Sequence, residues 1–186
     1  MRRRYVMAIE LVLLIIVATV IVLAFTRNTK TPATELTPAI MIEPENVGHL
    51  AVNSTFTVNV TVQNCTNIYA VQVDIHYDPQ VLNVTSISEG TFLNSTGPTY
   101  HNETAQLLNA TPPIARVFFV DTKLTYSLPD ASGNGTLLTI TFQVLSEGST
   151  LIHFFPYPGG GVSVGTYFEK RDLTEIIPEL NNGSYG

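Results

Sequence analysis

The sequence is poor in several residue types, and each shortage narrows the range of folds and functions. It holds a single cysteine, Cys65, so no disulfide can form within the chain, and we expect a small buried thiol. It holds no tryptophan, which weakens the case for a sugar-binding platform, although eight tyrosines are present. Stability must therefore come from an apolar core, with attached glycans as a possible supplement.

Basic residues are also scarce. Beyond residue 25 the chain carries 6 basic and 14 acidic residues, a net charge of −8. A domain with this charge repels phosphate backbones, so we expect no nucleic-acid partner.

Motifs for catalysis, metals and cofactors are missing. There is no Gly-x-Ser-x-Gly, and the glycine-rich stretch 159–165 lacks the Lys-Ser/Thr of a phosphate-binding loop. The four histidines share no metal-ligand spacing; they are His49, His76, His101 and His153. We therefore expect a protein that is not an enzyme and that has no catalytic residue, metal site or cofactor.

One membrane-length apolar segment is present. Tyr5 to Phe25 follows three arginines and is apolar apart from Glu10 and Thr19. Twenty-one helical residues reach about 31 Å, enough to cross a bilayer core. The preceding arginines favour a cytoplasmic N-terminus, so we predict a retained signal anchor or transmembrane helix over residues 1–25, with the rest outside the cell membrane. Cleavage after Val22-Leu23-Ala24, which would give a secreted protein, is the alternative.

Glu10 adds a second interpretation of this segment. An acidic residue in an apolar span is costly and often functional. The stretch from Ile9 to Val17 is similar to the start of type IV pilin helices. The chain therefore keeps open a role as the subunit of a filament.

Nine Asn-x-Ser/Thr sequons follow the apolar segment, more than chance pairing of these residues would give. Their density predicts a domain displayed outside a membrane and modified with N-glycans. The predicted glycosylation sites are Asn53, Asn59, Asn64, Asn83, Asn94, Asn102, Asn109, Asn134 and Asn182.

The remaining sequence divides into a linker and one domain. Residues 26–39 carry five threonines and two prolines without an apolar period, which is typical of a linker. From residue 40 to residue 186, short apolar alternations are separated by Gly, Pro, Asn and Asp. About 147 residues is a common size for a single domain.

Period-two alternation predicts strands in this domain. Phe56 to Val62 alternates apolar residues with polar ones, so Asn59 is predicted to face solvent. Tyr69 to Tyr77 alternates in the same way, with Gln72, Asp74 and His76 predicted to point outward before a turn at Asp78-Pro79. Further strands are predicted over 116–121, 136–145 and 151–155. Short strands at regular spacing, with no amphipathic helix, indicate an all-β sandwich or barrel.

Three motifs resemble the cohesin domain family, the modules that bind dockerins in cellulosome-type assemblies. The first is the alternating strand Thr55 to Val62, and the second is the strand ending in Tyr77-Asp78-Pro79, followed by Val81-Leu82. The third is Val117 to Asp121, followed after a loop by Gly135 to Val144. Asn182-Gly183-Ser184 is similar to the Asn-Gly-Ser that opens the family's last strand.

The resemblance implies a nine-stranded jelly-roll β-sandwich over residues 40–186. It also implies that one sheet face, carrying the outward residues of the strand before Tyr-Asp-Pro, binds a dockerin-type protein. We therefore predict a partner-binding face formed by Gln72, Asp74, His76 and Asp121. None of the nine sequons lies in the two strands that carry these residues, so this face is expected to be free of glycan.

Three functions remain open on the sequence. The first is a membrane-anchored, glycosylated surface module that binds a dockerin-type protein. The second is a carbohydrate- or polysaccharide-binding module of the same fold. The third is a structural subunit of a surface coat or pilus-like filament.

Overall fold

The computed structural model describes residues 36–160 and 164–186. Among those residues, no helix has the length and apolar character needed to cross a bilayer. The predicted anchor over residues 1–25 and most of the predicted linker lie outside the described residues, so both stay predictions. The described residues form one compact unit, Leu36–Gly186.

Strands dominate this unit, and its only helix among the described residues is the 3₁₀ turn Asn94–Thr96. The strands are β1 (Ala39–Glu43), β2 (Asn46–Val47), β3 (Thr55–Ile68), β4 (Ala70–Tyr77), β5 (Leu82–Glu89), β6 (Thr99–Leu108), β7 (Ile114–Lys123), β8 (Ala131–Val144), β9 (Thr150–Phe154), β10 (Tyr167–Glu169), β11 (Glu175–Ile176), β12 (Glu179–Asn181) and β13 (Gly183–Tyr185). All five predicted strands are confirmed.

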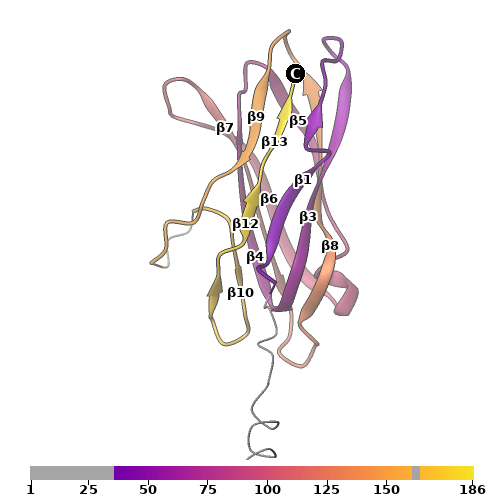
Figure 1. Ribbon diagram of the computed structural model, residues 1–186, viewed down its shortest axis with the longest axis vertical. Helices are drawn as coiled ribbons and strands as arrows, with labels where there is room; N and C mark the ends of the chain where they lie inside the picture. The colour runs from indigo at the N-terminus through magenta and orange to yellow at the C-terminus, as the bar shows by residue number, and fades with distance from the viewer. Residues whose placement is uncertain (1–35, 161–163) are drawn as a thin grey trace, which may run out of the picture. The chain divides into compact units, whose positions relative to one another are not determined.

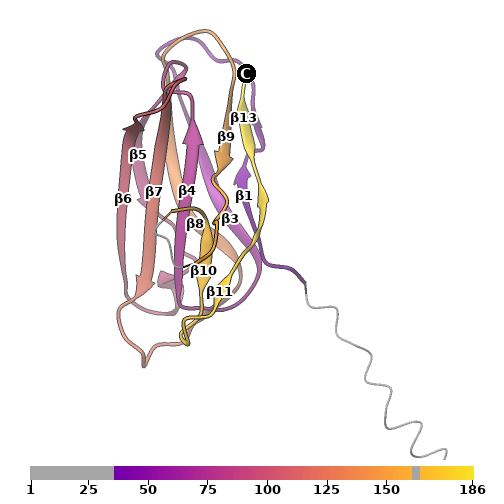
Figure 2. The ribbon, with the colours of Figure 1, turned by 90° about the vertical axis from the view of Figure 1, so that its left-hand side faces the viewer.

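The strands form two sheets that pack face to face (Figures 1 and 2). Sheet I has the order β12-β1-β3-β8-β5. Sheet II has the order β11-β10-β4-β9-β13-β2, with β7 on the other edge of β4 and β6 beyond β7. The predicted all-β sandwich is confirmed. The predicted count of nine strands stays a prediction, because several of the thirteen segments are only two or three residues long.

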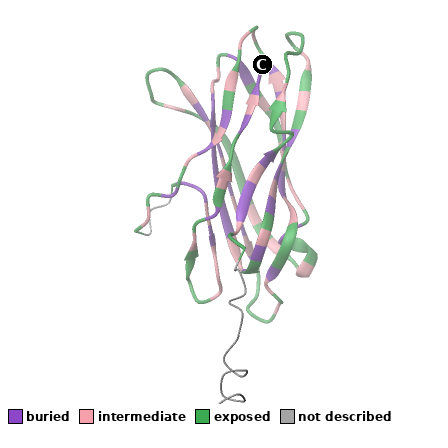
Figure 3. Cartoon of the chain, viewed as in Figure 1, coloured by how far each residue is buried: buried purple, intermediate pink, exposed green. Residues whose placement is uncertain are grey.

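Alternation along the strands builds the core (Figure 3). In β3, Val58, Val60 and Val62 are buried, whereas Thr57 and Asn59 are exposed, as the sequence pattern predicts. The buried residues of both sheets form one cluster that includes Cys65. Burial raises the pKa of the Cys65 thiol to about 12, so this cysteine is a packing residue.

Two features of chain routing position the functional site. The edge of β4 opposite β7 is shared, because β9 pairs with Ile75 and His76 while β10 pairs with residues 70–72. Between β9 and β10 the structure describes residues 155–160 and 164–166, which form no strand. We call these described residues the excursion. The second feature is a change of sheet at Asn182, because β12 pairs with β1 in sheet I and β13 pairs with β9 in sheet II.

Candidate functional site

The outer face of sheet II is the surface on which the sequence predicts partner binding. Strands β4, β7 and β6 lie side by side across it (Figure 2). Residues directly opposite one another in paired strands share a face, so the register assigns the outward side chains to four rows. These rows are Glu169-Ala70-Thr122-Tyr100, Tyr167-Gln72-Val120-Asn102, Asp74-Phe118-Thr104 and His76-Arg116-Gln106. We call this surface the β4–β7–β6 face.

The three predicted residues of β4 point away from the core, as predicted, but the structure shows that they are covered and cannot offer an open binding face. Gln72, Asp74 and His76 have exposed fractions of 7%, 1% and 9%. The excursion covers them. The Gln72 Nε2 atom donates to the Gly165 carbonyl at 2.8 Å, and the His76 ring stacks on Phe155 with centroids 4.9 Å apart.

Asp74 is the centre of this buried arrangement. Its carboxylate accepts two hydrogen bonds from Arg116, at 2.7 Å each, and one from the Gly165 amide at 2.9 Å. His76 Nε2 lies 3.2 Å from the same carboxylate. Burial opposes ionisation of Asp74, but the bonds from His76 and Arg116 outweigh it and hold the pKa below its ordinary value. Asp74 is thus a structural anion that fastens the excursion to β4.

Asp121 does not lie on the same face as the other three residues, so that part of the prediction is also wrong. The register places Asp121 opposite Val71, which faces the core. Its side chain is 2% exposed, and its Oδ1 atom has no hydrogen-bond partner among the described residues. Burial and the nearby charge of Glu89 raise the pKa of Asp121 to about 7. Asp121 therefore cannot contact a partner on the outer face.

The accessible part of the face is formed by residues that the strand pattern did not single out. Phe118, Val120 and Thr122 on β7 are half-buried, and Tyr100 on β6 is 56% exposed. The Arg116 guanidinium lies 4.1 Å from the centroid of the Phe118 ring. The face is therefore mainly apolar and aromatic along β7. Val120 is apolar like its core-facing neighbours, so the sequence pattern does not show that its side chain faces outward. The register, which places Val120 opposite Gln72, does show this.

One sequon lies on this face, although none lies in the two strands that the sequence analysis assigned to it. Asn102 is exposed on β6 directly opposite Val120, in the same row as Gln72. The sequence analysis missed this position because it predicted no strand over β6, which joins the face by pairing with β7 in the folded chain. Of the other sequon asparagines, Asn59 lies on the outer face of sheet I, as predicted. All nine are exposed except Asn64, which is half-buried.

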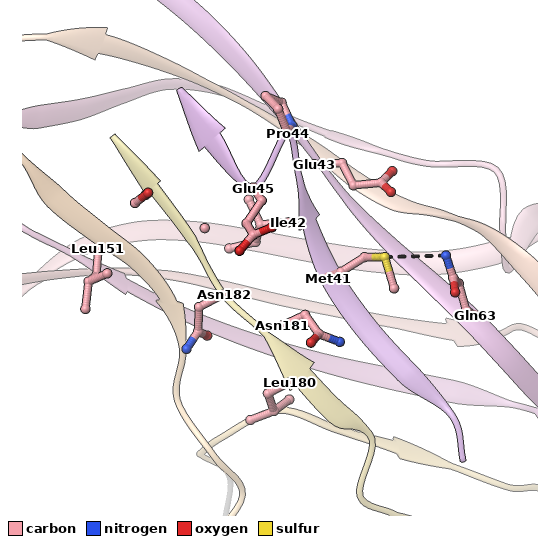
Figure 4. Close-up of a pocket in the computed structure, with 12 residues that line it drawn as sticks. Met41, Ile42, Glu43, Pro44, Glu45, Gln63, Leu151, Leu180, Asn181 and Asn182 are labelled. Carbon is pink, nitrogen blue, oxygen red and sulfur yellow. Dashed lines mark hydrogen bonds between the residues drawn. The ribbon is translucent and has the colours of Figure 1, made fainter. Parts of the chain in front are cut away.

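A larger hollow of about 920 Å³ lies where the chain changes sheets (Figure 4). It is bordered by β1, β12 and β13, and none of the predicted partner-binding residues lines it. Asn182 stands at its margin, and the Oδ1 atom of this residue accepts a hydrogen bond from the Phe154 amide at 2.9 Å. This bond gives Asn182 a structural role at the crossing, whether or not it carries a glycan.

Among the residues that the structure describes, no group of three or more His, Cys, Asp and Glu side chains could hold a metal ion. The β4–β7–β6 face carries apolar side chains at its centre and polar ones at its margin.

The comparisons with known proteins agree with this geometry. The family model for the cohesin domain matches residues 41–159. The chain therefore belongs to the cohesin domain family, a family of binding modules. A search of curated proteins finds no match to this sequence.

Solved cohesin structures share the fold. A non-cellulosomal cohesin from the hyperthermophilic archaeon Archaeoglobus fulgidus has 15% identity and a TM-score of 0.56, with 81% of this chain and 90% of that chain covered. A type II cohesin from Acetivibrio cellulolyticus has 20% identity and a TM-score of 0.59, with 81% and 95% covered. A cohesin–dockerin complex from Clostridium thermocellum has 20% identity and a TM-score of 0.57, with 81% and 98% covered.

Proposed function

We propose that this chain displays a protein-docking module outside a membrane and that the β4–β7–β6 face receives a dockerin-type partner. Membership of the cohesin family carries the proposal, and the half-buried apolar centre at Phe118 and Val120 supports it. Nine sequons with accessible asparagines and the apolar segment over residues 5–25 support display outside the cell. Dockerin partners are named for solved relatives of this fold.

Val120 is the position at which to test docking. It occupies the centre of the face, and its side chain makes no hydrogen bond that a substitution would break. Arginine at this position adds charge and bulk where a partner must lie flat. Gln72 and Asp74 are unsuitable for this purpose, because both are buried and bond to the excursion.

The full-length chain, its Val120→Arg variant and a Thr141→Arg variant would be used to capture partners from the native secretome. Thr141 is half-buried at the centre of the outer face of sheet I. It is therefore a control with burial similar to that of Val120 but on the other sheet. We expect Val120→Arg to weaken docking by about 2 kcal/mol or more, as at the centre of other interfaces. Mass spectrometry should identify proteins with dockerin-type modules, captured by the wild-type chain and by Thr141→Arg only.

Equal capture by all three proteins would contradict the assignment of the face.

The exposed ring of Tyr100 and the nearby Tyr167 favour a second candidate, a carbohydrate-binding module, because tyrosine rings can stack on sugars. If the wild-type chain retained only polysaccharide, and Val120→Arg did not, the carbohydrate-binding module would be the better assignment. Capture of further copies of this chain would point to the filament or coat subunit.

A further inference from the structure

A small depression lies at one end of the β4–β7–β6 face, between two tyrosines from different strands. It has a volume of about 230 Å³. Tyr100 of β6 borders it on one side and Tyr167 of β10 on the other, with Ala70, Val120 and Thr122 between them. Because the residues between the two tyrosines are small, the depression has room for one side chain of a partner. We call it the tyrosine slot.

One carboxylate lines the β10 side of the slot, and a second lies beside it. Glu169 borders the slot directly, and the β10–β11 register places Glu175 opposite it. Like charges at directly opposite positions repel each other. Burial and the charge of Glu175 raise the pKa of Glu169, which is the electrostatic mark of this repulsion. The Tyr157 hydroxyl donates to Glu175 at 2.6 Å, and the Tyr157 ring lies 4.4 Å from that of Tyr167.

No basic side chain within the described residues forms an ion pair with either glutamate. Residues 36–186 contain four basic and 13 acidic residues, a net charge of −9. Arg116 pairs with Asp74 and Arg171 pairs with Asp130. Lys123 is buried and donates to Leu93 and Thr96.

The fourth basic residue, Lys170, acts on a different carboxylate. Hydrogen bonds with Thr174 chiefly lower the pKa of Asp172, and the charge of Lys170 adds to this shift. Among the described residues, Glu169 and Glu175 therefore have no cationic partner, so the slot is electrostatically suited to a cation from another molecule.

We propose that the tyrosine slot binds an arginine side chain of the docked protein. A guanidinium group stacks on tyrosine rings and bonds to carboxylates through a planar fork of donors, and the slot offers both partners together. An arginine here would also relieve the repulsion between Glu169 and Glu175. This assignment rests on the proposed docking function and names the chemistry by which the partner is recognised.

The slot can be tested without knowing the partner. The full-length chain in detergent micelles would be titrated with N-acetyl-arginine amide, and the backbone amide shifts of Gln72 and Thr122 would be followed by NMR. N-acetyl-citrulline amide, which is nearly isosteric and uncharged, is the matched probe. We expect saturable shifts with the arginine probe and about ten-fold weaker binding, or none, with citrulline.

Variants separate the slot from general charge attraction. Glu169→Gln should weaken binding of the arginine probe by about ten-fold, whereas Glu147→Gln, which removes an exposed carboxylate elsewhere, should leave it unchanged. Unchanged spectra away from the slot would confirm that both variants are folded. Equal shifts with arginine and citrulline, or equal effects of the two variants, would overturn the proposal.

The two experiments distinguish a failure of the arginine assignment from a failure of the proposed docking function. Arginine binding together with an absence of protein partners would contradict docking and leave the slot standing. A different result would contradict the arginine assignment and support docking. In that result, Val120→Arg abolishes partner capture, whereas Glu169→Gln leaves it intact.

Discussion

Asp121 shows how one residue can carry an electrostatic cost inside the sandwich. Its carboxylate faces the core side of β7, and one oxygen lacks a hydrogen-bond partner among the described residues. Glu89 lies nearby and binds His101, whose Nδ1 atom is 3.1 Å from the Glu89 carboxylate. Charging Asp121 is therefore opposed by burial first and by Glu89 second, while His101 and Lys123 only partly compensate.

We predict that this residue makes stability depend on pH. The pKa of Asp121 is raised from 3.8 to about 7 on folding, so the folded state favours the protonated form. The stability from that form is fully present below about pH 4 and is lost as the pH rises through about 7. Urea midpoints measured from pH 4 to pH 8 should fall with rising pH in the wild type, and Asp121→Asn should remove much of this fall.

Glu147→Gln, which also removes one carboxylate but from an exposed position, is the control and should keep the wild-type pH profile. An Asp121→Asn profile parallel to that of the wild type would show that Asp121 is not the titrating group.

The burial and orientation of some single residues can be predicted from the sequence, whereas those of others cannot. The outward phase of Asn59 and the burial of Cys65 follow from alternation and composition, and both are confirmed. The placement of Asp121 does not follow, because Phe118, Phe119 and Val120 make β7 apolar on both faces. Only pairing with β4, more than forty positions away, decides which face Asp121 occupies.

At the scale of elements, Asp74 joins β4, β7 and the excursion. Its bonds to Arg116 on β7 and to Gly165 connect segments that are 42 and 91 positions away along the chain. The Thr166 hydroxyl accepts from the Asp74 amide at 3.0 Å and so lies in the same network. An ion pair buried to this extent is costly to break from one side, because the remaining charge is left without a partner.

We predict that Asp74→Ala lowers the free energy of unfolding by about 3–5 kcal/mol. Loss of the carboxylate leaves Arg116 unpaired and the Gly165 amide without its acceptor. Urea unfolding measures the first effect, and faster hydrogen exchange at the Gly165 amide measures the second. Glu147→Ala should change stability by less than about 0.5 kcal/mol. A comparable small change for Asp74→Ala would show that the network does not hold the excursion.

The alternation in β4 predicts the strand and its outward residues, and the structure confirms both. It does not predict that these residues are covered. Coverage comes from the excursion, and in the sequence the glycines and prolines of this stretch have no period and indicate only a loop. The accessible candidates Val120, Tyr100 and Glu169 likewise emerge only from the register of four strands.

For the whole molecule, the strand pattern and the family resemblance predicted the sandwich, and the cohesin match confirms the family. Display outside the cell is the part of the proposal that needs measurement. We predict that native protein carries glycans on several sequons, with Asn59 among them, because Asn59 is exposed on the outer face of sheet I. Intact mass above that of the bare polypeptide, and a smaller mass for Thr61→Ala, would be the expected result.

Thr61→Ala removes the acceptor signal of Asn59 and keeps the asparagine itself, whose Oδ1 atom accepts a hydrogen bond from Thr139. A native mass equal to that of the polypeptide would contradict glycosylation. N-terminal sequencing of the same sample would test the anchor, because a start at about Phe25 would indicate cleavage and secretion.

The crossing at Asn182 has a consequence for the order of events during biosynthesis. Strand β1 pairs with Glu179–Asn181, some 140 positions later, and Tyr185 stacks on Phe56 in the core with centroids 5.3 Å apart. A domain that emerges from a translocation channel in sequence order must wait for these last strands before either sheet is complete. If the sequons are glycosylated before the sandwich is complete, we expect the half-buried Asn64 to be modified as readily as the exposed sites. Residues 179–185 thereby set the time at which both sheets can be completed.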